Sequence, residues 1–364
     1  MINFFTIAFL YLSLSIGSFG LAEPDLARTG SMLVMFLFVV LTFPRPFNLS
    51  FFDAFIYCSL AAFLFLGLTR SHDLRLAINK IDGALLGSFL SFGLAKSAEL
   101  RLGKRAPGGF VFFSLLILFF TFFYKVNFGL DDRTVRFFLN GPIVFGWLMV
   151  YASIMSITAF LALGSFYYLL FSGLFFCAVI WSASKGPLLS FFSGIISLFL
   201  LTRRFALLWV SFFFILSAFF LIRYGAMPDR LASIERFLLF ENEQSDEGSV
   251  LLRQHMWRSS LDIIRERPLL GTGLGNWYFY TPVFSLAREV VYYPHNILLE
   301  LLSEHGFIGF FYILFLFFAI LTSSSSMLSR TLMVCGFTGL LFSGDLGYWH
   351  FLFGIPLAWR KLPY

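Results

Sequence analysis

Long apolar runs follow one another along almost the whole chain. We place twelve of them, at about residues 3–22, 27–43, 51–68, 76–95, 108–124, 141–161, 164–182, 187–202, 205–222, 296–321, 327–343 and 346–359. A helix of about 20 apolar residues crosses the hydrocarbon core of a bilayer. The runs are too continuous for the alternating strands of a membrane β-barrel. The sequence therefore predicts an all-α polytopic membrane protein with about twelve transmembrane helices.

The composition agrees with this class. Of the 364 residues, 59% are hydrophobic and 13% are charged, whereas soluble domains contain about 25% charged residues. The net charge of +6 reports topology first, and no soluble basic patch is interleaved with aromatic residues, so we expect no nucleic-acid partner. We interpret run 3–22 as an uncleaved first span because no Lys or Arg precedes it. Cys58, Cys177 and Cys335 lie inside apolar runs and are predicted to be buried small hydrophobes, not disulfide partners or metal ligands.

Basic residues in the short loops predict the orientation. One set of loops is almost free of acidic residues and is predicted to be cytoplasmic. It contains Arg45, Lys96, Arg101, Lys104, Arg105, Arg203, Arg204, Arg330, Arg360 and Lys361. Both termini are then cytoplasmic in a bacterial inner membrane, and segment 223–295 is periplasmic. We expect three parts: an N-terminal bundle of about nine spans (1–222), an Arg-rich periplasmic loop with short helices (223–295), and C-terminal transmembrane helices (296–364).

Segment 223–295 contains eight arginines and no lysine. This preference suggests forked contacts with carboxylate or phosphate groups, although a general preference of the chain for Arg explains it equally well. Residues 250–267 read as a helix that Pro268 ends. Within it, Arg253 has no carboxylate three or four positions away, so we rank it first as an anion ligand.

The other residues of this predicted helix have ordinary explanations. Asp262 is placed to pair with Arg258 and Arg265. We expect an apolar stripe that lies on the membrane domain, formed by Val250, Trp257, Leu261 and Ile264. The stretch PLLGTGLGN at 268–276 follows. It lacks a preceding strand and the GK[ST] ending of a phosphate loop, so we interpret it as a tight turn against the membrane.

His295 stands where this polar segment meets a long apolar run. Asn296 or His295 is expected to cap the helix that follows. The positive end of a helix disfavours imidazolium, so the histidine is predicted to be neutral, as a general base must be. An isolated histidine is more often a capping or interfacial residue.

Glu300 and Glu304 share one face of the following helix, where carboxylates are costly unless paired or functional.

Two further cations are predicted on the same side of the membrane as Arg253. Arg136 precedes one span and Lys185 precedes another. We expect them to form a cationic cluster with Arg253; the alternative is that each is an interfacial anchor. Lys80 and Asp82 are close enough in sequence to pair, and we assign them no role.

Four motifs, taken in order, resemble the O-antigen ligase and O-antigen polymerase superfamily. They are RQHMW at 253–257, PLLGTGLGN at 268–276, HNILLE at 295–300 and EHGFIG at 304–309. Upstream, SKG at 184–186 and NGP at 140–142 are similar to short family motifs. The resemblance implies a glycosyltransferase with a GT-C-like membrane fold and a glycan donor carried on undecaprenyl diphosphate.

The resemblance also implies roles for individual residues. His295 becomes the base that activates the acceptor hydroxyl, and Arg253, Lys185 and, more weakly, Arg136 become ligands of the diphosphate. Lys185 stands where the family usually has arginine and offers a point charge instead of a fork. Asn296 and Glu304 become supporting residues.

The acceptor is lipid A-core for a ligase or another glycan for a polymerase, and the sequence leaves both open. We predict transfer without a metal or other cofactor, because no DxD-type motif stands where a divalent ion would be expected; Asp131-Asp132 is the one pair that approaches it. Two other classes compete: a flippase for lipid-linked sugars, which needs a polar path through several spans, and a structural subunit of an export complex.

Overall fold

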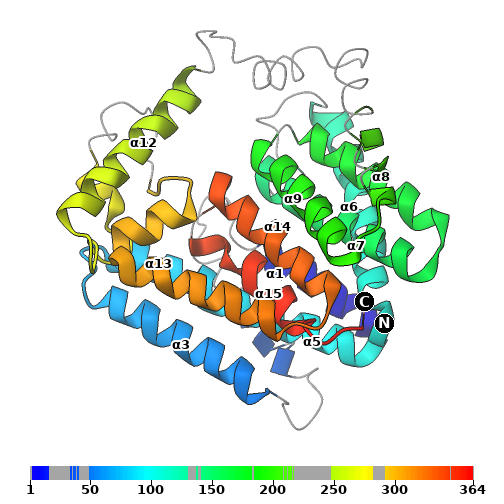
Figure 1. Ribbon diagram of the computed structural model, residues 1–364, viewed down its shortest axis with the longest axis horizontal. Coiled ribbons are helices and arrows are strands. Elements are labelled where there is room, and N and C mark those ends of the chain that lie inside the picture. Colours follow the sequence, from blue (N-terminus) through cyan, green and yellow to red (C-terminus); the bar gives the residue numbers. More distant parts are fainter. Residues whose placement is uncertain are drawn as a thin grey trace.

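The computed structural model describes most of the chain as helices (Figure 1). The described residues are 2–15, 33–34, 36–37, 39–40, 49–129, 137, 141–182, 184–207, 209–210, 212–214, 216, 247–281, 292–344 and 346–363. Their α-helices are α1 (Ile2–Ser15), α3 (Phe51–Leu68), α4 (Leu74–Ile81), α5 (Ser88–Leu102), α6 (Ala106–Phe128), α7 (Pro142–Leu163), α8 (Phe166–Trp181), α9 (Lys185–Thr202), α12 (Glu247–Glu266), α13 (Ile297–Ser323), α14 (Met327–Ser343) and α15 (Trp349–Ala358). Shorter turns are η2 (Asp82–Gly87), η3 (Gly103–Arg105), η4 (Trp277–Tyr280) and η6 (Leu346–Tyr348).

Five helical stretches in the described part are long and apolar enough to cross a membrane. They are Phe51–Leu68, Leu74–Phe128, Pro142–Leu163, Lys185–Thr202 and Ile297–Ser323. Two shorter apolar helices, Phe166–Trp181 and Met327–Phe342, accompany them. This all-helical architecture fits a membrane protein. The count of twelve spans stays a prediction, as does the GT-C-like fold. Most of run 27–43 and half of run 205–222 lie outside the described residues.

Several predicted spans coincide with helices. α3 and α14 have the predicted bounds, and α7 and α8 differ from them by one or two residues. The predicted run 76–95 is instead part of a longer stretch in which α4, the π-helical η2 and α5 follow one another. The last run, 346–359, forms η6 and the ten-residue α15, which is only about 15 Å long at 1.5 Å per residue.

The helices gather around α14, α15 and α5 (Figure 1). α3, α12 and α13 lie to one side of them, and α6 to α9 lie to the other. Gly194 of α9 faces Cys335 of α14, and Gly339 of α14 faces Trp147 of α7. These small residues allow close contact between helices, as is usual where apolar helices pack inside a membrane.

The prediction that all three cysteines are buried is wrong for two of them. Cys335 is buried, whereas Cys58 and Cys177 are exposed on the surface of the chain, and all three are free thiols. Apolar side chains on the outside of a membrane protein contact lipid instead of protein, so a position in an apolar run does not by itself imply burial within the chain.

Described loop residues gather at both ends of α3 and α13. At one end, the Arg360 side chain binds Asp53 and Ser50, and its carbonyl oxygen accepts from Ser325 and Ser326. We call this the Arg360 end. At the other, the α3–α4 loop, residues 268–276 and the start of α13 meet. We call this the His295 end. That this end is periplasmic stays a prediction.

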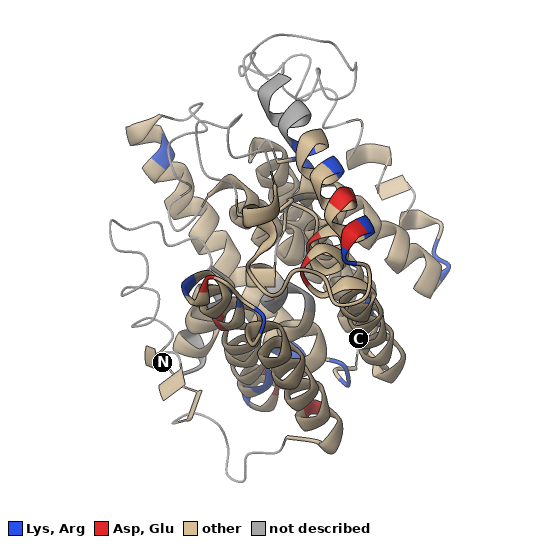
Figure 2. Cartoon of the chain, turned by 90° about the vertical axis from the view of Figure 1, so that its left-hand side faces the viewer, with Lys and Arg blue, Asp and Glu red and all other residues tan. Residues whose placement is uncertain are grey.

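Charged residues are sparse along the long helices and recur on α12 (Figure 2). α12 runs from Glu247 to Glu266 and matches the predicted helix 250–267 closely. Large apolar side chains cover the outer faces of α3 and α13, among them Phe55, Phe65, Phe311 and Phe315. On this side of the molecule, α12 therefore has a charged surface, whereas the outer faces of α3 and α13 are apolar.

Candidate functional site

The His295 turn, residues 292–296, delivers the chain into α13. His295 has a φ of 54°, in the left-handed region that few residues other than glycine adopt. Asn296 returns to extended backbone, and its side-chain oxygen accepts hydrogen bonds from the amides of Leu298 at 3.0 Å and Leu299 at 3.1 Å. Asn296 is therefore the N-cap. Helix capping, the ordinary explanation for a histidine at this position, is therefore the role of Asn296 and not of His295.

The imidazole of His295 is largely enclosed. The Tyr293 ring lies edge-on to it with centroids 4.4 Å apart. Its Nδ1 atom is buried and has no hydrogen-bond partner among the described residues. Burial, and then the positive charge of Arg253, lower the pKa of His295 from 6.5 to about 4. The histidine is therefore neutral near pH 7, as predicted, although burial and Arg253 are the causes.

α12 presents Arg253 to the His295 turn. The buried face of α12 consists of Met256, Ser260 and Ile263, which pack around Trp277. The Trp277 indole N–H donates to Ser260 Oγ at 2.8 Å. One turn of helix beyond Arg253, the Trp257 indole N–H donates to the carbonyl oxygen of Pro294 at 3.0 Å. These contacts fix the arginine-bearing helix against the residue that precedes His295.

The predicted apolar stripe on α12 is wrong in part. Leu261 is exposed and Ile264 is only partly buried, because the buried face is rotated toward Met256 and Ser260. The side chain of Val250 lies outside the described residues. The predicted pairing of Asp262 with Arg265 is confirmed, with an exposed contact at 3.0 Å.

The glycine turn, residues 268–276, fills a break in α13. Gly306 interrupts α13 with a φ of 64° and a ψ of −158°. In a continuous helix the Phe307 amide donates to the carbonyl of Ser303. Here it donates to Pro268 at 2.8 Å, while Ser303 accepts from the Thr272 amide at 2.9 Å. The turn thus satisfies both halves of a helical hydrogen bond.

The other side of the glycine turn docks on the α3–α4 loop. The Arg70 guanidinium donates to the carbonyls of Leu270 at 2.5 Å and Gly271 at 2.9 Å. The buried Asn276 amide donates to the carbonyls of Arg70 and Thr272, and its oxygen accepts from the His72 amide. The turn is therefore held on two sides.

These contacts also decide against a phosphate-binding role for the glycine turn. A phosphate loop offers unpaired amides to its ligand. The amides of Thr272, Gly273 and Leu274 donate instead to Ser303, Glu304 and Gly67. The interpretation of this stretch as a tight turn is thus confirmed.

A buried ion cluster joins α4 to the first turns of α13. Lys80 Nζ lies 2.5 Å from Glu300 Oε1 and 2.6 Å from Glu304 Oε1. Glu300 Oε2 accepts from the Leu346 amide at 3.1 Å, and Glu304 Oε1 accepts from the Trp277 amide at 3.4 Å. The carboxylates that the sequence places inside a span are therefore paired. Sequence proximity suggested Asp82 as the partner of Lys80 and missed these two, which lie more than 200 positions away.

Lys185 begins α9 and lies at the His295 end of the bundle. Ser190, one turn further into α9, donates to the carbonyl of Cys335 in α14, and Pro187 packs beside Gly146 near the start of α7. The N-terminal ends of α7 and α9 therefore face the C-terminal end of α14, close to Leu346. The joining of Lys185 with Arg253 stays a prediction, and Arg136 lies outside the described residues.

Possible metal ligands are not clustered in the described part of the chain. Within it, no group of three or more His, Cys, Asp or Glu side chains is arranged to hold a metal ion. Asp131-Asp132, the one pair singled out in the sequence, lies outside the described residues.

Residues 170–314 match the family model described as O-Antigen ligase. The match covers less than half of the chain, yet it contains α9, α12, the glycine turn, the His295 turn and the Gly306 break. No curated protein matches the chain. The resemblance to the O-antigen ligase superfamily is thereby confirmed over the part that carries the site.

Proposed function

We propose that the chain transfers a glycan from undecaprenyl diphosphate to an acceptor hydroxyl, because residues 170–314 match the O-antigen ligase family model. The family supports a ligase- or polymerase-type function in surface polysaccharide assembly. One observation supports specific roles for His295 and Arg253. The Trp257–Pro294 hydrogen bond holds the helix that bears Arg253 next to His295, whose imidazole is neutral near pH 7.

His295 acts as the general base. The acceptor hydroxyl gives its proton to the imidazole while its oxygen bonds to the anomeric carbon of the donor. The bond between that carbon and the diphosphate oxygen breaks, and undecaprenyl diphosphate leaves with the electron pair. Nδ1 is enclosed by the protein, so we assign the proton transfer to Nε2. A base whose pKa is about 4 is unprotonated at working pH, which secures the correct form at some cost in driving force.

Cations neutralise the leaving group. Arg253 is the first ligand of the diphosphate, and its fork suits two phosphate oxygens at once. Lys185, at the same end of the bundle, adds a point charge, and Arg136 is the third expected contributor. Fixed cations of this kind stabilise a departing diphosphate, so we propose that the transfer needs no metal ion.

The acceptor separates two versions of this function. In the ligase version the finished glycan moves to lipid A-core, and in the polymerase version it moves to another lipid-linked glycan. Both place the chain in the bacterial inner membrane with the His295 end in the periplasm. The acid–base arrangement of His295 and Arg253 favours an enzyme over a flippase or a structural subunit, neither of which needs a neutral imidazole beside a cation.

The test uses the full chain in proteoliposomes that hold an undecaprenyl-diphosphate-linked glycan. Lipid A-core or a second lipid-linked glycan is supplied as acceptor, with and without EDTA, and products are resolved by mass. We expect transfer that EDTA leaves unchanged and that His295→Ala and Arg253→Ala abolish.

Matched controls come from the same helix. His255→Ala and Arg258→Ala remove a histidine and an exposed arginine that helical spacing puts off the face of α12 shared by Arg253 and Trp257. We expect both variants to retain activity. Transfer by His295→Ala at the wild-type rate contradicts the assignment of the base. Movement of the donor across the bilayer without any product identifies a flippase instead.

A further inference from the structure

We propose that Lys80 is a positioning residue for the transfer reaction: by clamping Glu300 and Glu304, it holds in place the short helical segment that begins at the His295 turn. The inference rests on the proposed function, since it concerns the placement of the proposed base. The ion pairs of Lys80 Nζ are with the two glutamates and not with His295.

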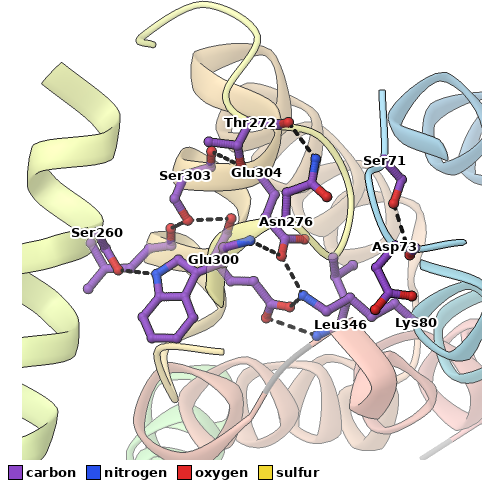
Figure 3. Close-up of polar contacts among 12 residues, drawn as sticks. Ser71, Asp73, Lys80, Ser260, Thr272, Asn276, Glu300, Ser303, Glu304 and Leu346 are labelled. Carbon is purple, nitrogen blue, oxygen red and sulfur yellow. Dashed lines mark hydrogen bonds and ion pairs between the residues drawn. The ribbon is translucent and has the colours of Figure 1, made fainter. Parts of the chain in front are cut away.

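The clamp is buried and closely packed (Figure 3). Lys80 Nζ contacts both carboxylates at 2.5 and 2.6 Å, and the side chains of both glutamates are fully buried. Glu300 and Glu304 are one helical turn apart, so a single ammonium bridges successive turns of α13. The cluster lies close to the site, because the Glu300 amide forms a helical hydrogen bond with the carbonyl of Asn296 at 2.9 Å.

The Gly306 break makes this segment dependent on the clamp. α13 begins at Ile297, and its helical geometry is interrupted at Gly306, so only nine residues, 297–305, precede the break. A helix this short is marginal on its own and relies on tertiary contacts. The helical hydrogen bond that would join Ser303 to Phe307 across the break is replaced by contacts with the glycine turn, so tertiary contacts take over part of the support that a continuous helix would give.

The clamp joins α4 and α13 to three further segments near the His295 turn: Leu346, Trp277 and α12. Glu300 accepts from Leu346, which follows α14, and Glu304 accepts from Trp277, whose indole contacts α12 through Ser260. Without Lys80, two carboxylates one turn apart remain buried with no cation between them. Such charges repel each other and are costly to bury, so the segment is expected to move and carry His295 with it.

The decisive variant is Lys80→Met, measured in the full chain with the lipid-linked donor. A misplacement of the base by about 1 Å lowers a rate by about 10²-fold, so we expect kcat to fall by about that factor. The KM of the donor should change much less, because the proposed cation ligands are untouched. Lys80→Arg, which keeps the charge, should recover most of kcat.

The pH profile of kcat supplies a second readout. The groups beside the imidazole are Arg253 of α12 and the Tyr293 ring. If the segment loosens, the imidazole becomes more hydrated, and the pKa of His295 should move from about 4 toward its usual 6.5. We therefore expect the acid limb of the profile of Lys80→Met to shift upward.

A matched control separates positioning from stability. Arg360 forms the corresponding buried ion pair with Asp53 at the opposite end of the bundle. Arg360→Met should lower the thermal midpoint, as loss of a buried cation does, while leaving the acid limb in place. If Lys80→Met fails to fold, the triple variant Lys80→Met/Glu300→Gln/Glu304→Gln removes the buried charges together and decides in its place; we expect low kcat from a folded protein.

The possible failures are distinguishable. Wild-type kcat and an unshifted acid limb in Lys80→Met, or in the triple variant where that is used, overturn the clamp. That result leaves the proposed function standing as long as His295→Ala is inactive. Full activity of His295→Ala overturns the proposed function, and the positioning role with it, whatever Lys80 does.

Discussion

Trp257 donates its indole N–H to the carbonyl oxygen of Pro294, 3.0 Å away and one residue before His295. The two residues are 37 positions apart in the sequence. Their bond ties α12 to the turn that opens α13, so it couples the placement of Arg253 to the placement of His295.

Loss of this bond should reduce transfer modestly. A hydrogen bond contributes about 1 kcal/mol net, which corresponds to about fivefold in a rate. We expect Trp257→Phe to lower kcat by about that factor in single-turnover transfer assays. Trp359→Phe is the matched control, because Trp359 donates its indole to the carbonyl of Ala95 near the Arg360 end of the bundle. Equal loss of kcat in both variants would contradict a specific role for Trp257.

Activity should persist in acid until the pH approaches 4. The pKa of His295 is about 4 in the folded chain and 6.5 when exposed. Arg253→Gln removes the second cause of this shift and leaves burial, the larger one. The pKa of His295 should then rise to a value between 4 and 6.5, measured by NMR titration of the imidazole, because Arg253 variants are expected to lack activity. Arg258→Gln, on the exposed face of α12, should leave the pKa of His295 unchanged, and a fall of that pKa in Arg253→Gln would count against the coupling.

The same shift makes stability depend on pH. Because the folded pKa is below the unfolded one, the unfolded chain binds a proton more readily. The contribution of neutral His295 is complete above pH 6.5 and is lost as the pH falls toward 4. We expect the thermal midpoint of His295→Gln to fall less than that of the wild type over this interval. Parallel curves for the two proteins would contradict the burial of a neutral imidazole.

The glycine turn should be intolerant of a methyl group. Gly271 has a φ of 62°, and a Cβ there would lie 2.5 Å from the carbonyl oxygen of Ser303. Gly164 has a similar φ of 69° with open space around it, so Gly164→Ala isolates the backbone cost of about 1–2 kcal/mol. We expect Gly271→Ala to lower the free energy of unfolding by clearly more than Gly164→Ala does. Equal costs would mean that the turn does not depend on close contact with α13.

Lys185 should act on donor binding. Hydrogen bonds to charged groups contribute about 1.5–3 kcal/mol, so Lys185→Met should raise the KM of the lipid-linked donor by about tenfold or more. Lys185→Arg should bind at least as well, since a fork suits phosphate. Lys96→Met is the control, because Lys96 pairs with Glu99 at 2.6 Å on α5. An unchanged KM in Lys185→Met would remove Lys185 from the diphosphate site.

Local sequence signals predicted the features that depend on neighbouring residues. The bounds of α3 and α14, the capping of α13 by Asn296 and the tight turn at 268–276 all follow from apolar length, cap chemistry and glycine spacing. The neutral form of His295 was also predicted, although its main physical cause, burial, was not. Each of these features is determined within a few residues of where it is read.

Features that depend on tertiary contacts were not predicted from the sequence. The partners of Lys80 are on α13, far along the chain, while nearby Asp82 looked like a partner. Trp257 and Leu261 seemed to form one apolar stripe, but packing against Trp277 rotates α12 so that Leu261 faces outward. Helical periodicity predicts the buried face of a helix only to within a residue or two. The surface against which the helix packs determines which of these faces is buried.

The break at Gly306 has a consequence for the membrane insertion of α13 and for the design of chimeras. During membrane insertion, unpaired backbone groups inside the bilayer cost several kcal/mol each. In the folded chain, the Ser303 carbonyl and the Phe307 amide find their partners in the glycine turn. Biogenesis of α13 thus includes a step in which the polar segment made just before it folds back onto it. For the same reason, a chimera between relatives should carry residues 268–307 as one cassette and not divide them at the membrane boundary.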